Sequence, residues 1–70
     1  MADRSVAKVV ELTAKSSKSF EDAIQAGIKR ANKTLKNVKG AWVKEMKVDC
    51  KDGEVTAYCV NMNVTFVLDE

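Results

Sequence analysis

The chain has 70 residues, of which 46% are hydrophobic and 31% charged, a composition typical of one small globular domain. Its apolar runs are too short to cross a membrane, and the charges at Asp3, Arg4, Lys8 and Glu11 exclude a secretory signal there. Histidine is absent, which removes the usual general base and the imidazole metal sites, so we expect no enzyme.

The two cysteines, Cys50 and Cys59, are too few for a disulfide scaffold and lack metal-site spacing, so we expect reduced thiols and a cytoplasmic location. The net charge is +2, with +5 on residues 1–40 and −3 on residues 41–70, which is poor evidence for nucleic-acid binding. A core of this size is marginal without a disulfide or a metal, so self-association is the expected source of stability.

The first predicted element is a strand over residues 6–13, after residues 1–5, which we expect to fray. Residues 14–19 are predicted to form a loop, and Ser19 to begin a helix with Asp22 in the position of a capping box. Spacings of four, four, three and four give the helix one apolar stripe, formed by Phe20, Ile24, Ile28, Ala31 and Leu35. Gly40 is expected to follow the helix as a stop or a bend.

Two further strands are predicted at residues 41–50 and 54–68, joined by an Asp52-Gly53 hairpin turn. The order β-α-β-β predicts an α+β fold of one domain, residues 1–70, in which a three-stranded antiparallel sheet partly wraps one helix. A two-residue turn pairs Lys51 with Glu54. The register then places Met46 opposite Cys59, Lys44 opposite Asn61, Trp42 opposite Asn63 and Gly40 opposite Thr65.

This register places Trp42 on the sheet face away from the helix, where a monomer would leave it in water. Met46 and Val48 are predicted to share that face, whereas Glu45 and Lys47 are predicted to point to the helix side. Trp42 would then either pack against a neighbouring subunit or line a ligand site between subunits. The last strand would reach ~45–50 Å, whereas a domain of this size is ~28 Å across, which favours an assembly with sheets inside and helices outside.

Four segments resemble the dodecin family: the VxxL pattern of the first strand, SFEDAIQAGIKRANKTLKNV, WVKE and YCVNMNVTFVLD. The resemblance implies a homododecamer, a hollow shell with helices outside and sheets inside. It also implies binding or storage of a flavin such as FMN or riboflavin, without turnover. In flavin-binding dodecins a Trp that begins the second strand stacks on the flavin, and a Gln early in the third strand binds the ring edge.

By position, the stacking Trp falls on Gly40 and the Gln on Cys59, so both flavin contacts are missing. Trp42 lies ~6–7 Å further along the same strand, on the same face. The resemblance therefore predicts a shell with an altered pocket, in which flavin binding is weaker by roughly a thousandfold. The candidate ligand-binding residues are Gly40, Trp42, Lys44, Glu45, Cys59 and Asn61, with no catalytic or metal site.

Three alternatives stay open. Trp42 could fill the former pocket of a purely structural assembly. An anion or nucleic acid could bind a basic helix face formed by Lys29, Arg30, Lys33, Lys36 and Lys39, although a solvated face explains these residues equally well. A metal could bind three carboxylates at the turn, Asp49, Asp52 and Glu54, but they lack the loop of a dedicated calcium motif.

Overall fold

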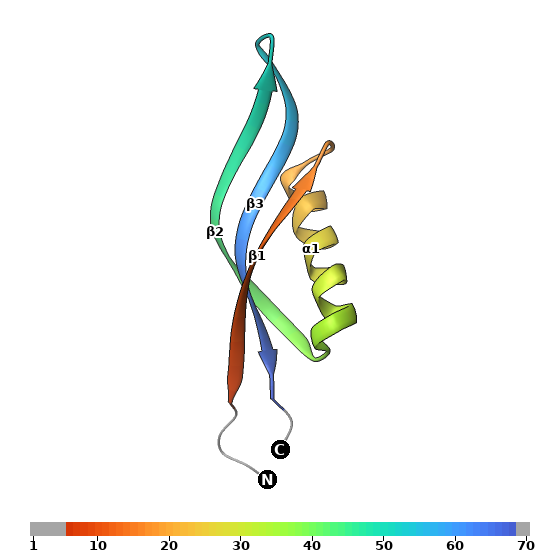
Figure 1. The fold of residues 1–70 in the computed structure, drawn as a ribbon, viewed down its shortest axis with the longest axis vertical. Helices are drawn as coiled ribbons and strands as arrows, with labels where there is room; N and C mark the ends of the chain where they lie inside the picture. The colour runs from red at the N-terminus through yellow and green to blue at the C-terminus, as the bar shows by residue number, and fades with distance from the viewer. Residues whose placement is uncertain (1–5, 69–70) are drawn as a thin grey trace.

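The computed structural model describes residues 6–68, in which one helix packs on one face of a three-stranded antiparallel sheet (Figure 1). The elements are β1 (Ala7–Ser16), α1 (Phe20–Leu35), β2 (Val38–Lys51) and β3 (Glu54–Val67), and the strand order is β1-β3-β2. The predicted β-α-β-β fold is confirmed, whereas the predicted fraying of residues 1–5 lies outside the described residues. The helix α1 is neither long nor apolar enough to cross a membrane.

The start of α1 is fixed by Ser19, whose hydroxyl accepts a 3.0 Å hydrogen bond from the backbone N–H of Asp22. The Asp22 carboxylate in turn accepts a 2.7 Å hydrogen bond from the hydroxyl of Ser16. The predicted loop over residues 14–19 is therefore too long. Lys15 and Ser16 still belong to β1, because they pair with Cys59 and Tyr58 of β3.

The helix ends earlier than the sequence predicted, and Gly40 does not stop it. Lys36 and Asn37 have φ angles of 60° and 51°, and the Lys36 N–H donates a 3.2 Å hydrogen bond to the Asn32 carbonyl. Positive φ angles at two consecutive residues turn the chain into β2, which already contains Lys39 and Gly40. Lys36 and Lys39 therefore lie beyond the helix, and the five basic residues do not form a single helical face.

Two β-bulges change the register that the hairpin turn alone predicts. Cys50 pairs with Val55 but Asp49 pairs with Ala57, which leaves Thr56 as an extra residue in β3. The Thr56 hydroxyl donates to the Asp49 carbonyl at 3.2 Å. A second shift leaves Lys44 as an extra residue in β2. The two shifts offset each other, so the predicted pairs Trp42–Asn63 and Gly40–Thr65 are confirmed.

Between the bulges each β2 residue pairs one position away from the prediction. Met46 lies opposite Val60 and not Cys59, and Glu45 lies opposite Asn61. Since side chains alternate along a strand, Met46 and Val48 are on the helix side of the sheet. Glu45 and Lys47 are on the opposite side, so the predicted faces of these four residues were wrong.

The core lies between the helix and the middle of β3. Val60, Met62 and Val64 have no exposed surface, and Leu12 of β1 and Ile24 and Ile28 of α1 pack against them. Phe20 and Tyr58 close one end with an edge-to-face ring contact at 5.1 Å. The helix residues nearest the sheet are small, Ala23, Gly27 and Ala31, which lets the helix backbone approach β3 closely.

Gly27→Ala is expected to destabilise the fold by about 1 kcal/mol, because overpacking outweighs the gain in helix propensity. A Cβ atom at this position would collide with the end of the fully buried Met62 side chain and lie 3.2 Å from Ala14 Cβ. Urea denaturation measures the change. Gln25→Ala, on the exposed side of the same helix, is the control and should change stability by less than about 0.5 kcal/mol.

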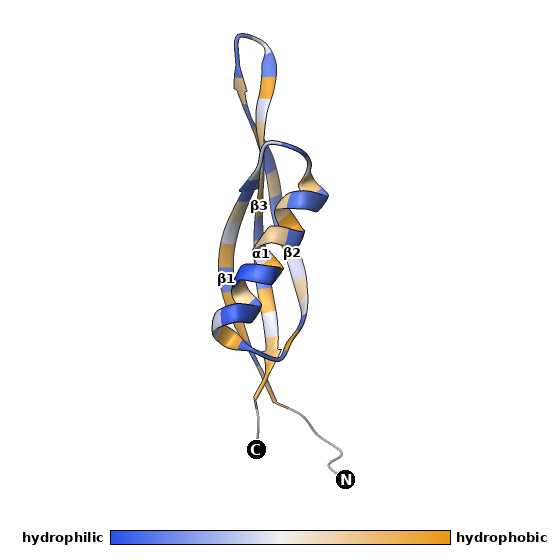
Figure 2. Cartoon of the chain, turned by 90° about the vertical axis from the view of Figure 1, so that its right-hand side faces the viewer, coloured by the Kyte–Doolittle hydropathy of each residue, from blue (hydrophilic) through white to orange (hydrophobic). Residues whose placement is uncertain are grey.

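The β2–β3 hairpin extends past the N-terminal end of α1, as the length of the last strand predicted (Figure 1). The longest dimension is 56 Å and the radius of gyration is 14.6 Å, against about 11 Å for a compact chain of this length. Apolar segments continue onto the part of the hairpin that the helix leaves uncovered (Figure 2), where Met46, Val48 and Val55 are 39–52% exposed. A single chain therefore leaves much apolar surface in contact with water.

Candidate ligand-binding site

The sheet face away from the helix, the open face, carries the six candidate residues, but the structure divides them between two hollows. Glu45, Cys59 and Asn61 line the first, and Gly40 and Trp42 line the second. Lys44 lies at the bulge between the two, where its ammonium group is 3.3 Å from the Glu11 carboxylate of β1. The two hollows follow one another along β2.

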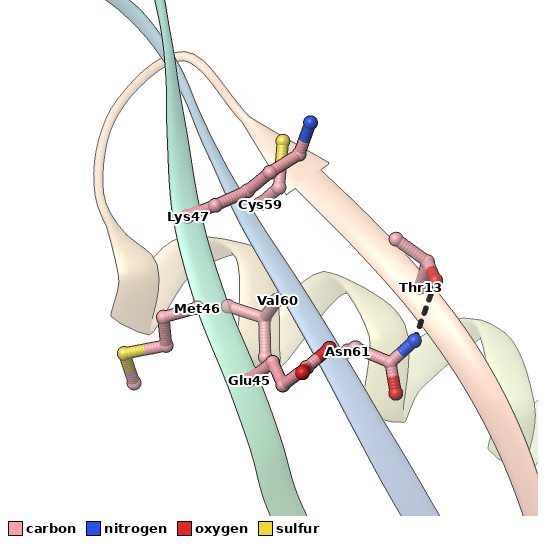
Figure 3. Close-up of a pocket in the computed structure, with 7 residues that line it drawn as sticks. All are labelled: Thr13, Glu45, Met46, Lys47, Cys59, Val60 and Asn61. Atoms are coloured by element: carbon pink, nitrogen blue, oxygen red, sulfur yellow. Dashed lines mark hydrogen bonds between the residues drawn. The ribbon is translucent and has the colours of Figure 1, made fainter.

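The first hollow, the Asn61 hollow, is an open depression of about 530 Å³ where all three strands meet (Figure 3). Its lining residues are Thr13, Glu45, Met46, Lys47, Cys59, Val60 and Asn61. The Asn61 amide nitrogen donates a 3.3 Å hydrogen bond to the Thr13 hydroxyl, and the amide oxygen points away from Thr13. That oxygen is buried and has no hydrogen-bond partner among the described residues.

The second hollow, the Trp42 hollow, has a volume of about 300 Å³ and is lined by Lys39, Gly40, Ala41, Trp42 and Thr65. The Trp42 side chain is 65% exposed. A Cβ atom added at Gly40 would meet no atom within 4 Å, and Gly40 is not among the positive-φ residues. The position where the family resemblance places a stacking Trp is therefore open space beside Trp42.

The charged side chains next to the Asn61 hollow form a cluster centred on Asp49. Its carboxylate lies 3.2 Å from Lys15 Nζ and 3.4 Å from Lys47 Nζ. The thiol of Cys59, which is buried, donates to the same carboxylate at 3.7 Å. Hydrogen bonds from Lys15 and then Lys47, with their charges, hold the pKa of Asp49 below its ordinary value of 3.8. The hydrogen bond and charge of Asp49 raise the pKa of Lys15 above 10.5.

Asp49→Asn is expected to have a small, pH-dependent effect on thermal stability, because Asp49 is only half-buried and both lysines paired with it are solvent-exposed. The lowered pKa of Asp49 means that its contribution is complete above pH 3.8 and is lost as the pH falls through the folded-state pKa. The raised pKa of Lys15 keeps its contribution complete below pH 10.5. The melting temperatures of the wild-type protein and the Asp49→Asn variant should therefore differ by a constant amount from about pH 5 to about pH 9. Below about pH 4 the difference should be smaller. A difference that widens in acid would contradict this account.

The sequence prediction missed Thr13, Lys47 and Asp49 as neighbours of the site. Thr13 was taken as the last residue of its strand, and the bulges moved Lys47 and Asp49 to the open face. A signal for the bulges is present in the sequence. Apolar residues occupy odd positions at Ala41 and Val43 but even positions at Met46 and Val48, and this change of phase marks the extra residue between them.

The three turn carboxylates proposed as an alternative metal site do not come together. Asp49 is engaged by Lys15 and Lys47, and within residues 6–68 no group of three His, Cys, Asp or Glu side chains is arranged to hold a metal ion.

Comparison with known proteins agrees with this fold. The Dodecin family model matches residues 6–69. The dodecin of Thermus thermophilus is 40% identical over 65 residues, which cover 93% of this chain and 94% of the relative. The crystal structure of the tt0972 protein from Thermus thermophilus matches with a TM-score of 0.89 at 39% identity, covering 96% of this chain and 98% of that one.

Two further solved structures have the same architecture. Dodecin from Streptomyces davaonensis matches with a TM-score of 0.90 at 32% identity and covers 97% of this chain and 100% of its own. A calcium dodecin from Mycobacterium tuberculosis, described as calcium-chelating with a novel calcium-binding site, matches with a TM-score of 0.78 at 25% identity over 91% of each chain. One helix on a three-stranded antiparallel sheet thus defines a class of small α+β proteins. Within that class the chain belongs to the dodecin family.

Proposed function

We propose that the chain assembles into a homo-oligomeric shell, of twelve copies as in the family resemblance, which binds or stores a flat aromatic small molecule on its open face without turning it over. Dodecins are small-molecule-binding oligomeric proteins. The observation that carries the proposal is Trp42, which is 65% exposed and borders both an open Gly40 and an ion-paired Lys44.

Covering Trp42 would supply a substantial part of the free energy of assembly. A Trp side chain contributes roughly 150–250 Å² of surface, so burying the exposed part contributes about 2–4 kcal/mol per chain. Either a neighbouring copy or a stacked ligand would remove this surface from water.

Flavins such as riboflavin or FMN are the first candidate cargo, and we expect weak binding. Cys59 and Gly40 replace the two side chains that the family resemblance assigns to flavin contacts. The open face still carries the aromatic ring of Trp42 and the amide side chains of Asn61 and Asn63.

Titration of riboflavin fluorescence with increasing concentrations of the assembled protein tests the ligand part of the proposal. We expect quenching that saturates only at tens to hundreds of micromolar protein, roughly a thousandfold above a tight flavin site. A flat titration, together with a Trp42 emission that acrylamide does not quench, would instead support an assembly whose pocket Trp42 fills.

A further inference from the structure

We propose that the outward side of α1 binds the phosphate backbone of double-stranded nucleic acid, without reading its sequence, through Lys29, Arg30 and Lys33, the basic half of α1. The helix covers the sheet face opposite to the open face (Figure 1), so this is a second surface, separate from the proposed ligand site. In the proposed shell the helices lie outside, where each copy presents its basic half to the solvent.

The charges of the chain are separated along the sequence. No acidic residue occurs between Asp22 and Glu45, whereas that segment holds the cations Lys29, Arg30, Lys33, Lys36, Lys39 and Lys44. Within α1 the acidic residues lie in the first turn, and Asp22 is about 10 Å from Lys29 along the helix axis. The net charge of +2 therefore understates the positive charge on the second half of the helix.

The basic half of α1 also differs from the open face in its ion pairs. On the open face, Lys15, Lys44 and Lys47 each lie within 3.4 Å of a carboxylate oxygen. Among residues 6–68, no carboxylate lies within ion-pair distance of the basic half of α1. Its charges are therefore available to an external anion, whereas the cations of the open face would first have to leave their partners.

The helix holds the three cations on one side of its axis. Lys29 and Lys33 are about one turn apart, ~6 Å along the axis, and Arg30 lies beside them. All three residues are exposed. The Arg30 guanidinium donates a 2.8 Å hydrogen bond to the Thr34 hydroxyl, which orients the group and leaves further N–H donors for a phosphate. Positive groups at a fixed spacing on one rigid element can contact neighbouring phosphates of a duplex together.

Nucleic acid fits this surface better than a membrane does. The large apolar side chains of α1, such as Ile24 and Ile28, pack against the core, so they are not free to insert into a lipid interface. Phe20 is the one aromatic residue of α1, and its ring contacts Tyr58 and not the solvent side on which a base could stack. Contacts would therefore go to phosphates, which carry no sequence information.

Assembly would strengthen a weak contact. Three cations on one copy correspond to weak, non-specific binding that depends steeply on salt. When several copies of one shell touch the same duplex, each contact after the first is intramolecular, and the overall affinity rises without any new kind of contact. The inference therefore relies on the proposed assembly for its strength, although the surface itself is present in a single chain.

The test measures binding of a fluorescently labelled duplex DNA of random sequence to the assembled protein by anisotropy, between about 50 and 200 mM salt. If the three cations of one copy engage phosphates, the affinity should fall roughly fortyfold over that range, because each engaged phosphate contributes about −0.9 to the slope of log affinity against log salt. The double substitution Lys29→Gln and Lys33→Gln should reduce this slope to about one third. The matched control, Lys18→Gln with Lys51→Gln, makes the same charge change at exposed lysines outside α1 and should leave the slope unchanged.

Native mass and the riboflavin titration are recorded for each protein. If the double variant fails to assemble, Lys29→Gln and Lys33→Gln alone replace it, and each should lower the slope by about one third. Absence of duplex binding at about 50 mM salt, or an equal loss of slope in the control, would overturn the inference. Binding to vesicles of phosphatidylserine and phosphatidylcholine but not to the duplex would overturn it in favour of a membrane surface. These outcomes leave the proposed function intact, because it is judged from the native mass and the riboflavin titration, which the helix substitutions should not change.

Discussion

Gly40→Trp is expected to strengthen flavin binding by roughly tenfold to a hundredfold. The substitution restores an aromatic side chain where the family resemblance places the stacking Trp, and ring stacking contributes about 0.5–1.5 kcal/mol beyond the area it buries. The site can accept the larger side chain, because no atom lies within 4 Å of an added Cβ and the backbone φ is not positive.

The matched control is Gly40→Leu, which adds a bulky side chain without a ring and should leave flavin affinity within about threefold of wild type. Riboflavin titration of the three proteins, each checked for native mass, gives the comparison. An equal gain with leucine would show that hydrophobic bulk and not stacking is limiting. No gain with either side chain would contradict the assignment of this face as the ligand site.

Met62→Ala is expected to destabilise the protein by about 2–5 kcal/mol, the range for removing a fully buried methionine side chain. Met62 has no exposed surface and lies under Gly27 of the helix, with Leu12 on the neighbouring strand. The cavity left behind could collapse only if the helix moved towards β3. Urea denaturation at a fixed protein concentration measures the loss.

Met62→Leu conserves most of the volume and should cost less than about 1.5 kcal/mol. Met46→Ala gives a second comparison, because this methionine is 52% exposed in the single chain. Its replacement should change the concentration dependence of assembly more than it changes the folding stability of a single subunit. Equal losses for Met62→Ala and Met62→Leu would contradict the packing described here.

The fold could be predicted from the sequence because its local signals agree with one another. The Ser19 cap, the helical spacing from Phe20 to Leu35 and the Asp52-Gly53 turn each indicate the element that forms. The end of the helix could not be predicted from Gly40. Lys36 and Asn37 have positive φ angles there, and of the two residue types only Asn tolerates a positive φ readily.

The sheet faces of the candidate residues were predicted in part. Trp42, Gly40, Cys59 and Asn61 were assigned to the open face, and the structure places them there. Glu45 and Lys47 were assigned to the wrong face, because alternation was extended through Lys44 and Thr56 as if neither were extra. The Asp49 cluster depends on that shift and on the longer β1, so pattern reasoning could not reach it.

The central claim is that copies of this chain cover one another's open faces. The most direct test is the native mass in dilute buffer, measured by light scattering or native mass spectrometry, with an absorption spectrum on the same peak. Twelve chains of 7.7 kDa predict a particle of about 92 kDa, and weak flavin affinity predicts no visible colour after purification. A stable monomer of 7.7 kDa would contradict the claim.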